Sequence, residues 1–479
     1  MEKITDLTLL EVADKIKKGE LKSEDVVRAC LEQIKETANI NALISVVEEE
    51  RAIKQAKEAD RMAAEGVNKP LLGVPVVVKD NISTTDFQTT CGSKFLKGYV
   101  PQFEATCSKK LREAGAIIIG KANMDEFAMG SSGENSAYGK TLNPVNIEYV
   151  PGGSSSGSAA TVAAHQCFAS LGTDTGGSIR QPAAFCGVVG IKPTYGRVSR
   201  YGVVAFGSSL DQVGPITRTV KDNALMLDII CGKDALDATS MERKDGSFLK
   251  ACAGSIKGMK IGVCKEFYEL GLDAEIKNEI DKTIEFYKNN GAEIVDVSLP
   301  SVSKGLAAYY VLSSAEAASN LSRFDGIKYG VRAKNYNGLV DMYFKSRTEG
   351  FGMEVKRRIM MGNYCLSAGY YDAYYKKSLQ VQQVIKREFG EAFKKCDAII
   401  SPVAPTVAFK FGSKASPLEM YLGDVYTVLI NVVGCPSIAF PLGLNKDGMP
   451  IACQLIGDMW QEEKLYKLAN YYEEQGSKK

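Results

Sequence analysis

Residues 151–193 read PGGSSSGSAATVAAHQCFASLGTDTGGSIRQPAAFCGVVGIKP and contain two loops of small residues, GGSSSGS and DTGGS. A helix-like run and a strand-like run join the two loops. Each loop sets serines beside glycines, so backbone N–H groups can approach a bound molecule closely. This combination suits acyl transfer, in which a hydroxyl attacks a carbonyl carbon and amide donors stabilise the oxyanion. Such a serine needs a base.

The chain contains a single histidine, His165, so a Ser-His-Asp triad could use no other imidazole. If Ser156–Gln166 forms a helix that rises about 1.5 Å per residue, His165 lies about 15 Å along the axis from Ser155. A strand over Cys167–Thr173 would then return the chain and bring DTGGS back to GGSSSGS. We expect both serine loops at one end of these elements and His165 at the other, packed at a helix end.

The segment GSSSG also matches the G-x-S-x-G nucleophile elbow of α/β-hydrolases, with Ser155 at its centre. That fold places its histidine late in the chain, after the acidic residue of the triad. Here the histidine follows Ser155 closely and no later histidine exists. We therefore reject the elbow interpretation and expect a base of another residue type.

A lysine can act as the base when burial lowers its pKa enough to leave a neutral amine near pH 7. The candidate is Lys79 in LGVPVVVKDN, where Val74 and Val76–Val78 form a strand-like run that draws the lysine stem toward a core. The competing interpretation is a lysine that ends a strand and extends its ammonium group into solvent. Taken alone, the local pattern favours this second interpretation.

Three separated motifs, KDN, GGSSSGSA and DTGGSIRQPA, resemble the amidase signature family, whose members use a Ser-Ser-Lys triad. The resemblance implies that Lys79 is the base, which reverses the preference drawn from the local pattern. It also implies that Ser154 is the bridging serine, next to a cis peptide bond, and that Ser178 is the nucleophile. The oxyanion hole implied by the resemblance consists of the backbone N–H groups of Thr175, Gly176, Gly177 and Ser178.

The loop NMDEFAMGSSGENSA resembles the glutamine-site loop of one branch of this family, which serves tRNA-dependent amidotransferases. The resemblance places Met129 and Ser131 nearest the substrate. It implies Tyr309 as a pocket wall, Arg358 as the partner of the substrate α-carboxylate and Asp424 as the anchor of its α-ammonium group. Taken without the resemblance, the local patterns would favour a core tyrosine for Tyr309, a solvated helix residue for Arg358 and a carboxylate at a helix start for Asp424.

Charge and composition exclude several other classes. Lys plus Arg number 59 and Asp plus Glu 57, so the net charge of +2 gives no overall basic footprint for nucleic acid. The 12 cysteines are scattered without a C-x-x-C pair, and with one histidine we expect no metal site. No apolar run is long enough to span a bilayer, and the acidic N-terminal stretch is unlike a signal peptide. We expect a cytoplasmic protein with reduced thiols.

Strands and helices alternate along the chain, which indicates an α/β fold with a large, mixed, mostly parallel sheet covered by helices on both faces. The length allows one domain or two, and the resemblance favours a single amidase domain over residues 1–479. Within it we expect N-terminal helices (1–65) and a Ser-Ser-Lys core (70–220). An inserted α/β and helical subregion (255–395) would contribute to the substrate pocket, before C-terminal strands and a helix (396–479).

The resemblance also implies partners. A B subunit would bind ATP, Mg²⁺ and the mischarged Glu-tRNA(Gln), and a small C subunit would wrap around this chain in a heterotrimer. Whether Asp-tRNA(Asn) is a second substrate would depend on the B subunit. This chain itself would need no cofactor. GENSAYGKT nearly mimics a P-loop, but five residues instead of four separate its two glycines, so we reject ATP binding here.

Two other functions stay open at this point. The first is a stand-alone amidase of the same family that acts on a small aryl or aliphatic amide. Arg358 and Asp424 discriminate against it, because an uncharged amide has no use for a pair of opposite charges in its pocket. The second is an inactive scaffold that only supports an assembly. Covalent labelling of Ser178 by an activated acyl or sulfonyl reagent would argue against a scaffold.

Overall fold

The structure, a computed structural model, describes residues 3–243, 246–414 and 416–476. The strands are β1 (Leu43–Val46), β2 (Pro75–Lys79), β3 (Ile117–Ala122), β4 (Ala169–Asp174), β5 (Val189–Lys192), β6 (Gln212–Thr217), β7 (Lys260–Cys264), β8 (Glu293–Val297), β9 (Ala398–Pro402), β10 (Ser437–Leu444) and β11 (Pro450–Gly457). The α-helices are α1 (Leu9–Lys17), α2 (Ser23–Glu36), α3 (Glu49–Ala64), α4 (Thr106–Glu113), α5 (Ser156–Ala163), α6 (Arg180–Cys186), α7 (Val220–Ile230), α8 (Phe248–Ala251), α9 (Ala274–Asn289), α10 (Val302–Asn320), α11 (Gly338–Gly350), α12 (Met353–Leu366), α13 (Lys377–Phe393), α14 (Pro417–Leu422), α15 (Val428–Val433) and α16 (Glu462–Gln475). None of the described helices is long and apolar enough to cross a membrane.

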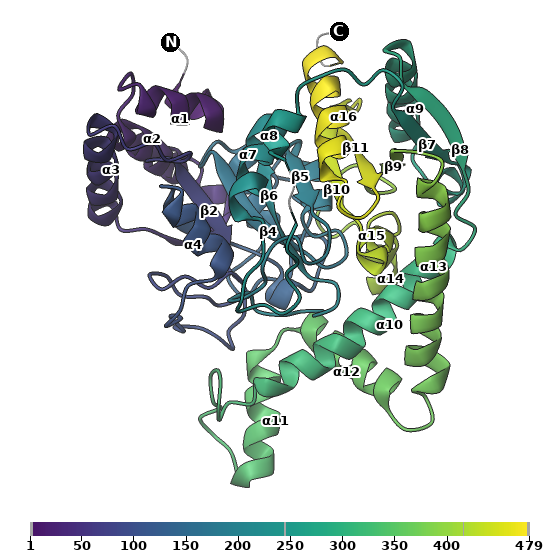
Figure 1. Cartoon of the computed structure of the whole chain (residues 1–479). Coiled ribbons are helices and arrows are strands. Elements are labelled where there is room, and N and C mark those ends of the chain that lie inside the picture. Colours follow the sequence, from purple (N-terminus) through teal and green to yellow (C-terminus); the bar gives the residue numbers. More distant parts are fainter. Residues whose placement is uncertain (1–2, 244–245, 415, 477–479) are drawn as a thin grey trace.

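One mixed sheet runs through the molecule (Figure 1). In the described part of the chain it has eleven strands in the order β1-β3-β2-β4-β6-β5-β10-β11-β9-β7-β8. The parallel pairs are β2 with β3 and β4, and β7 with β8 and β9. The mixed α/β sheet is as predicted, but its parallel share is smaller than expected. The reason is that β5, β6, β10 and β11 pair antiparallel, and β10 and β11 are joined by a short hairpin instead of a crossover helix.

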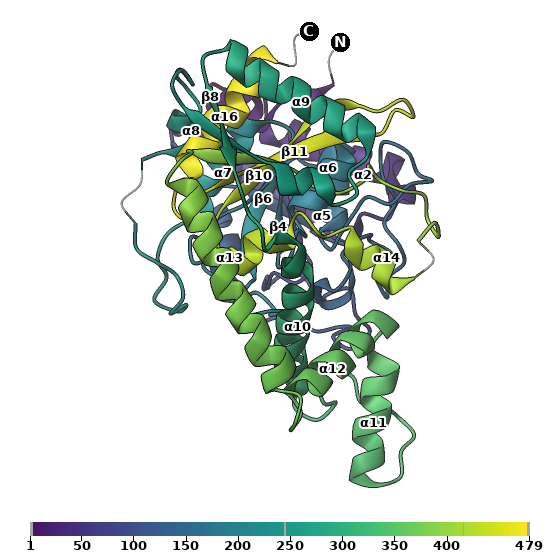
Figure 2. The same cartoon turned by 90° about the vertical axis from the view of Figure 1, so that its right-hand side faces the viewer.

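Helices cover both faces of this sheet, as the alternation of elements predicted (Figures 1 and 2). On one face α7 packs on α16, which also accepts a hydrogen bond from Tyr287 of α9. On the other face α5 and α6 lie against the central strands. The main core of buried Val, Ile, Leu and Ala side chains fills the space between these helices and the sheet. Helices α10 to α13 extend away from the sheet, and α12 and α13 pack on α10.

The N-terminal region contains the expected helices α1, α2 and α3, but it also contributes a strand that the sequence did not indicate. That strand, β1, lies between α2 and α3 and pairs antiparallel with β3 at the edge of the sheet. Its four residues, LISV, are too few to establish an alternating pattern, so periodicity alone could not separate it from the flanking helices.

The two small-residue loops of the sequence lie together at the carboxyl ends of the central strands. β2 and β4 are parallel neighbours, with Val78 opposite Leu171, so their carboxyl ends lie side by side. Lys79 ends β2 and DTGGS follows β4, while α5 begins within GGSSSGS. α5 ends at Ala163, before the predicted Gln166, since His165 has a φ of +57° and cannot continue a right-handed helix.

Candidate active site

Lys79 lies at the carboxyl end of β2 with its side chain fully buried. Its Nζ lies 2.8 Å from Ser154 Oγ and 2.9 Å from both Ser155 Oγ and Thr173 Oγ1. Asn81 donates to the same Thr173 hydroxyl oxygen at 3.0 Å. The competing interpretation of an ammonium group that extends into solvent is therefore wrong. The lysine is instead surrounded by hydroxyl groups inside the protein.

Burial lowers the pKa of Lys79 to about 7, because an ammonium group loses its hydration inside the protein. The carboxylates of Asp125, Asp174 and Asp211 favour the charged form and so limit this shift. At neutral pH a substantial fraction of Lys79 is therefore a neutral amine. Such an amine can accept the proton of a neighbouring hydroxyl group, which an ordinary lysine cannot do.

The two serine loops meet beside this lysine. The Gly153–Ser154 peptide bond is cis, and Ser154 is as fully buried as Lys79, whereas 8% of Ser178 is exposed. The N–H of Ser155 donates to the carbonyl oxygen of Ser178 at 3.1 Å and so joins the loops. Among the described residues, no group hydrogen-bonds the Ser178 hydroxyl. Its oxygen is therefore free to contact a substrate.

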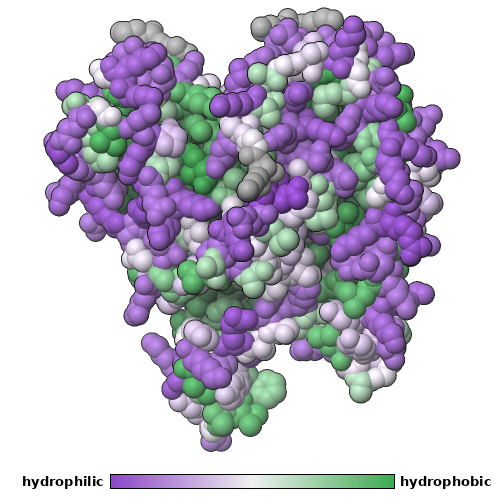
Figure 3. Space-filling view, in the orientation of Figure 1, coloured by the Kyte–Doolittle hydropathy of each residue, from purple (hydrophilic) through white to green (hydrophobic). Residues whose placement is uncertain are grey.

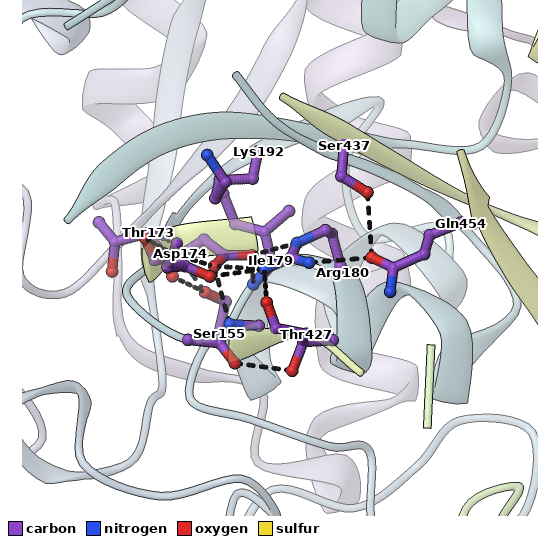
Figure 4. Close-up of polar contacts among 12 residues, drawn as sticks. Ser155, Thr173, Asp174, Ile179, Arg180, Lys192, Thr427, Ser437 and Gln454 are labelled. Carbon is purple, nitrogen blue, oxygen red and sulfur yellow. Dashed lines mark hydrogen bonds and ion pairs between the residues drawn. The ribbon is translucent and has the colours of Figure 1, made fainter. Parts of the chain in front are cut away.

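A buried ion pair between Asp174 and Arg180 holds the DTGGS loop (Figure 4). The Nε of Arg180 lies 3.0 Å from Asp174 Oδ2, Nη1 lies 2.9 Å from Gln454 on β11, and Nη2 lies 2.7 Å from Asn431 on α15. Burial alone would raise the pKa of Asp174, but the Arg180 guanidinium lowers it to about 2. The carboxylate thus stays ionised and fixed under the loop.

The backbone of DTGGS presents open N–H donors next to Ser178. Gly177, with a φ of +126°, donates its N–H to Asp174 Oδ1 at 2.8 Å. No acceptor in the described ranges takes the N–H of Thr175, Gly176 or Ser178. Gly177 therefore departs from the predicted set of four oxyanion donors, because its hydrogen is directed at a carboxylate. The loop offers the other three to a substrate.

His165 lies away from this cluster, against the N-terminal segment, as predicted. Its Nδ1 lies 3.1 Å from the Thr5 carbonyl oxygen and 3.1 Å from Asp6 Oδ1, and Arg218 Nη1 lies 2.8 Å from it. Burial, together with the charge of Arg218, lowers the pKa of His165. The only imidazole of the sequence is therefore a packing residue beyond the end of α5.

A second polar cluster forms around Asp424, in the turn between α14 and α15. Asp424 is buried, and its Oδ2 accepts hydrogen bonds from Ser131 at 2.9 Å and from the Tyr310 hydroxyl at 2.7 Å. Burial raises the pKa of Asp424 to about 6, so the carboxylate is largely ionised at neutral pH. Its Oδ1 has no partner among the described residues and could accept from a cationic ligand.

Arg358, on α12, stands next to this cluster with only 3% of its surface exposed. Its guanidinium carbon lies 4.6 Å from the centre of the Tyr310 ring and 4.7 Å from that of Tyr421. Its Nε donates to Glu354 at 2.8 Å. Arg358, Glu354, Tyr421 and Ser131 line a cavity of about 290 Å³. Through Tyr310 the structure thus brings the predicted Arg358, Ser131 and Asp424 together.

The remaining two predicted substrate residues are Tyr309 and Met129. Tyr309 is buried with its ring 5.1 Å from that of Tyr310. A Cβ on Gly176 would overlap the Tyr309 hydroxyl oxygen, so this tyrosine reaches the DTGGS loop. Met129 packs in an apolar cluster of buried phenylalanines. Like Asp424 and Tyr309, it is not among the residues that line the cavity.

Two residues that sequence reasoning missed connect the polar cluster around Asp424 to the serine loops. Thr427 donates to the Gly176 carbonyl oxygen at 2.7 Å and also lies 3.1 Å from the carbonyl oxygen of Asp424. Gln181 donates to the Ser131 carbonyl oxygen at 2.9 Å and accepts a backbone N–H from the GGSSSGS loop at 2.9 Å. Gln181 was visible within the motif DTGGSIRQPA, but no local pattern indicated its partners.

A serine cluster around a desolvated lysine has the composition of a site in which a lysine could take the place of the histidine beside a nucleophilic serine. The chain belongs to the amidase family, whose family model matches residues 25–466. A relative from Caldanaerobacter subterraneus subsp. tengcongensis, named as the A subunit of glutamyl-tRNA(Gln) amidotransferase, is 52% identical over 98% of this chain and 96% of its own length.

Solved structures of two relatives have the same fold. The crystal structure of the glutamyl-tRNA(Gln) amidotransferase A subunit from Thermotoga maritima is 40% identical, with a TM-score of 0.82 over 98% of this chain and 95% of that one. The peptide amidase from Stenotrophomonas maltophilia is 29% identical, with a TM-score of 0.83 over 98% of this chain and 97% of that one. The likeness spans nearly the full length in each case.

Proposed function

We propose that this chain is the glutamine-hydrolysing A subunit of a tRNA-dependent amidotransferase. The relatives that carry the name of the glutamyl-tRNA(Gln) amidotransferase A subunit, half identical over nearly the whole chain, support this function. The single observation that carries it is that two buried, opposite charges, Arg358 and Asp424, contact the same residue, Tyr310. A free amino acid carries this pair of charges, whereas an aryl or aliphatic amide carries neither.

In this proposal Arg358 binds the α-carboxylate of glutamine and Asp424 binds its α-ammonium group. Arginine suits the carboxylate because its planar fork offers two parallel N–H donors. The ionised Asp424 suits the ammonium group because its Oδ1 is open. Tyr309 closes the space between this end of glutamine and the DTGGS loop, where the side-chain amide would lie.

Hydrolysis then proceeds through the lysine and the two serines. Neutral Lys79 accepts the proton of Ser154, Ser154 takes that of Ser178, and the Ser178 oxygen bonds to the amide carbon. The oxyanion is stabilised by the N–H groups of Thr175, Gly176 and Ser178, each worth about 3 kcal/mol in a dry site. The relay returns its proton to the departing ammonia. Water then cleaves the acyl-enzyme, releasing glutamate and restoring Ser178.

The ammonia would pass to a partner protein without entering bulk water, where it would be protonated and lost. We propose that this partner, a B subunit, binds ATP, Mg²⁺ and mischarged Glu-tRNA(Gln), and that a small C subunit completes a cytoplasmic heterotrimer. The near-zero net charge and the failed P-loop match support this division of labour, since the sequence shows neither a basic footprint for tRNA nor a P-loop for ATP.

The test measures ammonia and glutamate released from glutamine by the purified full chain, alone and with candidate B and C subunits. Butanamide and an aryl amide serve as the alternative substrates. We expect glutamine to be strongly preferred, with greater turnover in the assembled complex. Preference for an uncharged amide would instead identify a stand-alone amidase. Failure of a sulfonyl fluoride to label Ser178, together with no turnover of any amide, would identify a scaffold.

A further inference from the structure

We infer that Glu354 is a positioning residue that orients Arg358 for the carboxylate group of the substrate. This inference rests on the proposed function and deepens it. Glu354 and Arg358 stand one turn apart on α12, and the Nε of Arg358 donates to Glu354 Oε1 at 2.8 Å. Pairs at this spacing on a helix surface contribute little. This pair is buried, with 9% of Glu354 exposed, so its geometry is fixed by the surrounding protein.

A second donor fixes the same carboxylate oxygen. The hydroxyl of Tyr421, on α14, donates to Glu354 Oε1 at 2.8 Å. Arg357 pairs with the other oxygen, Oε2. Burial alone would raise the pKa of Glu354, but the positive charge of Arg358 lowers it, so the carboxylate stays ionised. Glu354 thus receives donors from α12 and α14 at once and cannot rotate without breaking both.

The consequence for Arg358 is that one edge of its guanidinium is occupied and the other is open. Nε is bound to Glu354, and no carboxylate or carbonyl oxygen among the described residues accepts from Nη1 or Nη2. The Tyr310 and Tyr421 rings, themselves stacked 4.2 Å apart, contact the guanidinium and restrict its rotation. Arg358 is one of the residues that line the cavity. A carboxylate bound at its open edge would meet Nη1 and Nη2 already in position.

Glu354 therefore affects substrate binding but not the chemical step, and it does so only for substrates that carry a carboxylate. Without it, the guanidinium keeps its charge but loses the contact that sets its rotation, and binding a carboxylate must restore that order. The ammonium end of the substrate depends on Asp424, whose hydrogen-bond partners among the described residues do not include Glu354. The reacting groups around Lys79 are likewise independent of it. Replacing Glu354 should therefore affect some substrates and not others, and this difference identifies its role.

The experiment compares glutamine with two analogues that each lack one charged group. 4-Carbamoylbutanoate keeps the carboxylate and lacks the ammonium group, and 4-aminobutanamide keeps the ammonium group and lacks the carboxylate. The variants are Glu354→Ala, Glu354→Gln and Tyr421→Phe in the full chain, with its partner subunits if glutamine hydrolysis requires them. Glu391→Gln, which removes an exposed carboxylate on α13, is the matched control.

We expect Glu354→Ala to raise KM for glutamine and 4-carbamoylbutanoate about tenfold or more, since a hydrogen bond to a charged group is typically worth 10-fold or more in binding. For 4-aminobutanamide kcat/KM should be unchanged, as should kcat for glutamine. Glu354→Gln keeps an acceptor oxygen and should recover part of the loss. Tyr421→Phe should raise the same KM values less, and should add nothing to Glu354→Ala.

Equal losses on all three substrates would show that Glu354 only supports the fold, and unchanged KM values for both carboxylate substrates would likewise overturn the inference. If wild-type protein hydrolyses 4-aminobutanamide or uncharged amides in preference to glutamine, the proposed function fails and the positioning role falls with it. If wild-type protein prefers glutamine and Glu354→Ala does not alter KM, the positioning role alone fails.

Discussion

The Nζ of Lys79 lies 2.8 Å from the Oγ of Ser154, and neither side chain is exposed to solvent. A fully charged ammonium group would be costly at this position. The same burial that lowers the pKa of Lys79 also surrounds its amine with hydroxyl groups. The arrangement allows proton transfer between an amine and a hydroxyl in a protein whose single histidine lies elsewhere.

Replacing Ser178 by alanine should abolish glutamine hydrolysis and leave the stability close to that of the wild type. The stability should hold because, within the described residues, no group hydrogen-bonds the Ser178 hydroxyl oxygen. Ammonia release and the thermal unfolding midpoint measure the two effects. Measurable turnover by Ser178→Ala would exclude this serine as the nucleophile.

Activity should depend on a group that must lose a proton at about pH 7. Since burial lowers the pKa of Lys79 to about 7, the neutral amine predominates above that pH and disappears below it. We therefore expect kcat/KM to rise with pH through about 7 and then level off. Lys79→Arg should be inactive at every pH, because a guanidinium keeps its proton. A profile that is flat from pH 5 to pH 9 would contradict the lysine base.

Below about pH 6 a second effect should appear in KM. Burial raises the pKa of Asp424 to about 6, so acidification protonates the carboxylate that would bind an ammonium group. KM should rise for glutamine and 4-aminobutanamide but not for 4-carbamoylbutanoate. Asp424→Asn should raise KM for glutamine by about 10- to 100-fold, as expected for a hydrogen bond between charged groups. Acid sensitivity shared by all three substrates would assign this effect to another group.

His165→Gln should retain glutaminase activity. His165 contacts the Thr5 carbonyl oxygen and Asp6, and glutamine can replace a hydrogen bond there. Any change should be confined to stability, within about 1 kcal/mol, as is usual for a partly exposed side chain. A loss of kcat without a loss of folded protein would mean that the histidine takes part in the chemistry after all.

Two helical glycines should respond to alanine in opposite directions. Gly390, in the exposed part of α13, would place a new Cβ in open space, so Gly390→Ala should raise the free energy of unfolding by about 0.5–1 kcal/mol. Gly305, in α10, would place it in overlap with a Leu429 methyl carbon, so Gly305→Ala should destabilise the protein. Denaturant titration of both variants provides the comparison, and a stabilised Gly305→Ala would refute the packing of α10 on α15.

The sequence was most informative where one local pattern determines one structural feature. The apolar run before Lys79 and the small residues of DTGGS predicted a strand end and a loop with open backbone N–H groups, and the structure has both, although the loop is buried. The contacts of Lys79 with Ser155 and Thr173 could not be predicted, because they depend on which strands are neighbours. A run of apolar residues does not specify its partner strand or its direction, which is why the parallel share of the sheet was overestimated.

The same limit applies to the substrate pocket. Arg358, Ser131 and Asp424 came from a resemblance, and their joining through Tyr310 emerges only from the packing of α10, α12 and α14. The involvement of Gly177 with Asp174 also depends on the turn geometry of a folded loop, which residue type alone does not give. Met129 illustrates the reverse case, since neighbouring residues on one loop need not share a pocket.

The groups that would react all fall between residues 79 and 178, but Arg180, which immobilises their loop, has partners at positions 427, 431 and 454. A gene fragment that stopped before residue 427 would encode every reacting atom and still leave Arg180 without these three partners. Attempts to shorten this protein into a compact catalyst should therefore fail. Residues 427–454 must therefore be synthesised and folded before the motifs at residues 79–178 can work. On the face that Figure 3 shows, the upper part of the molecule is mostly hydrophilic, so the hydropathy of this surface gives no sign of the dependence.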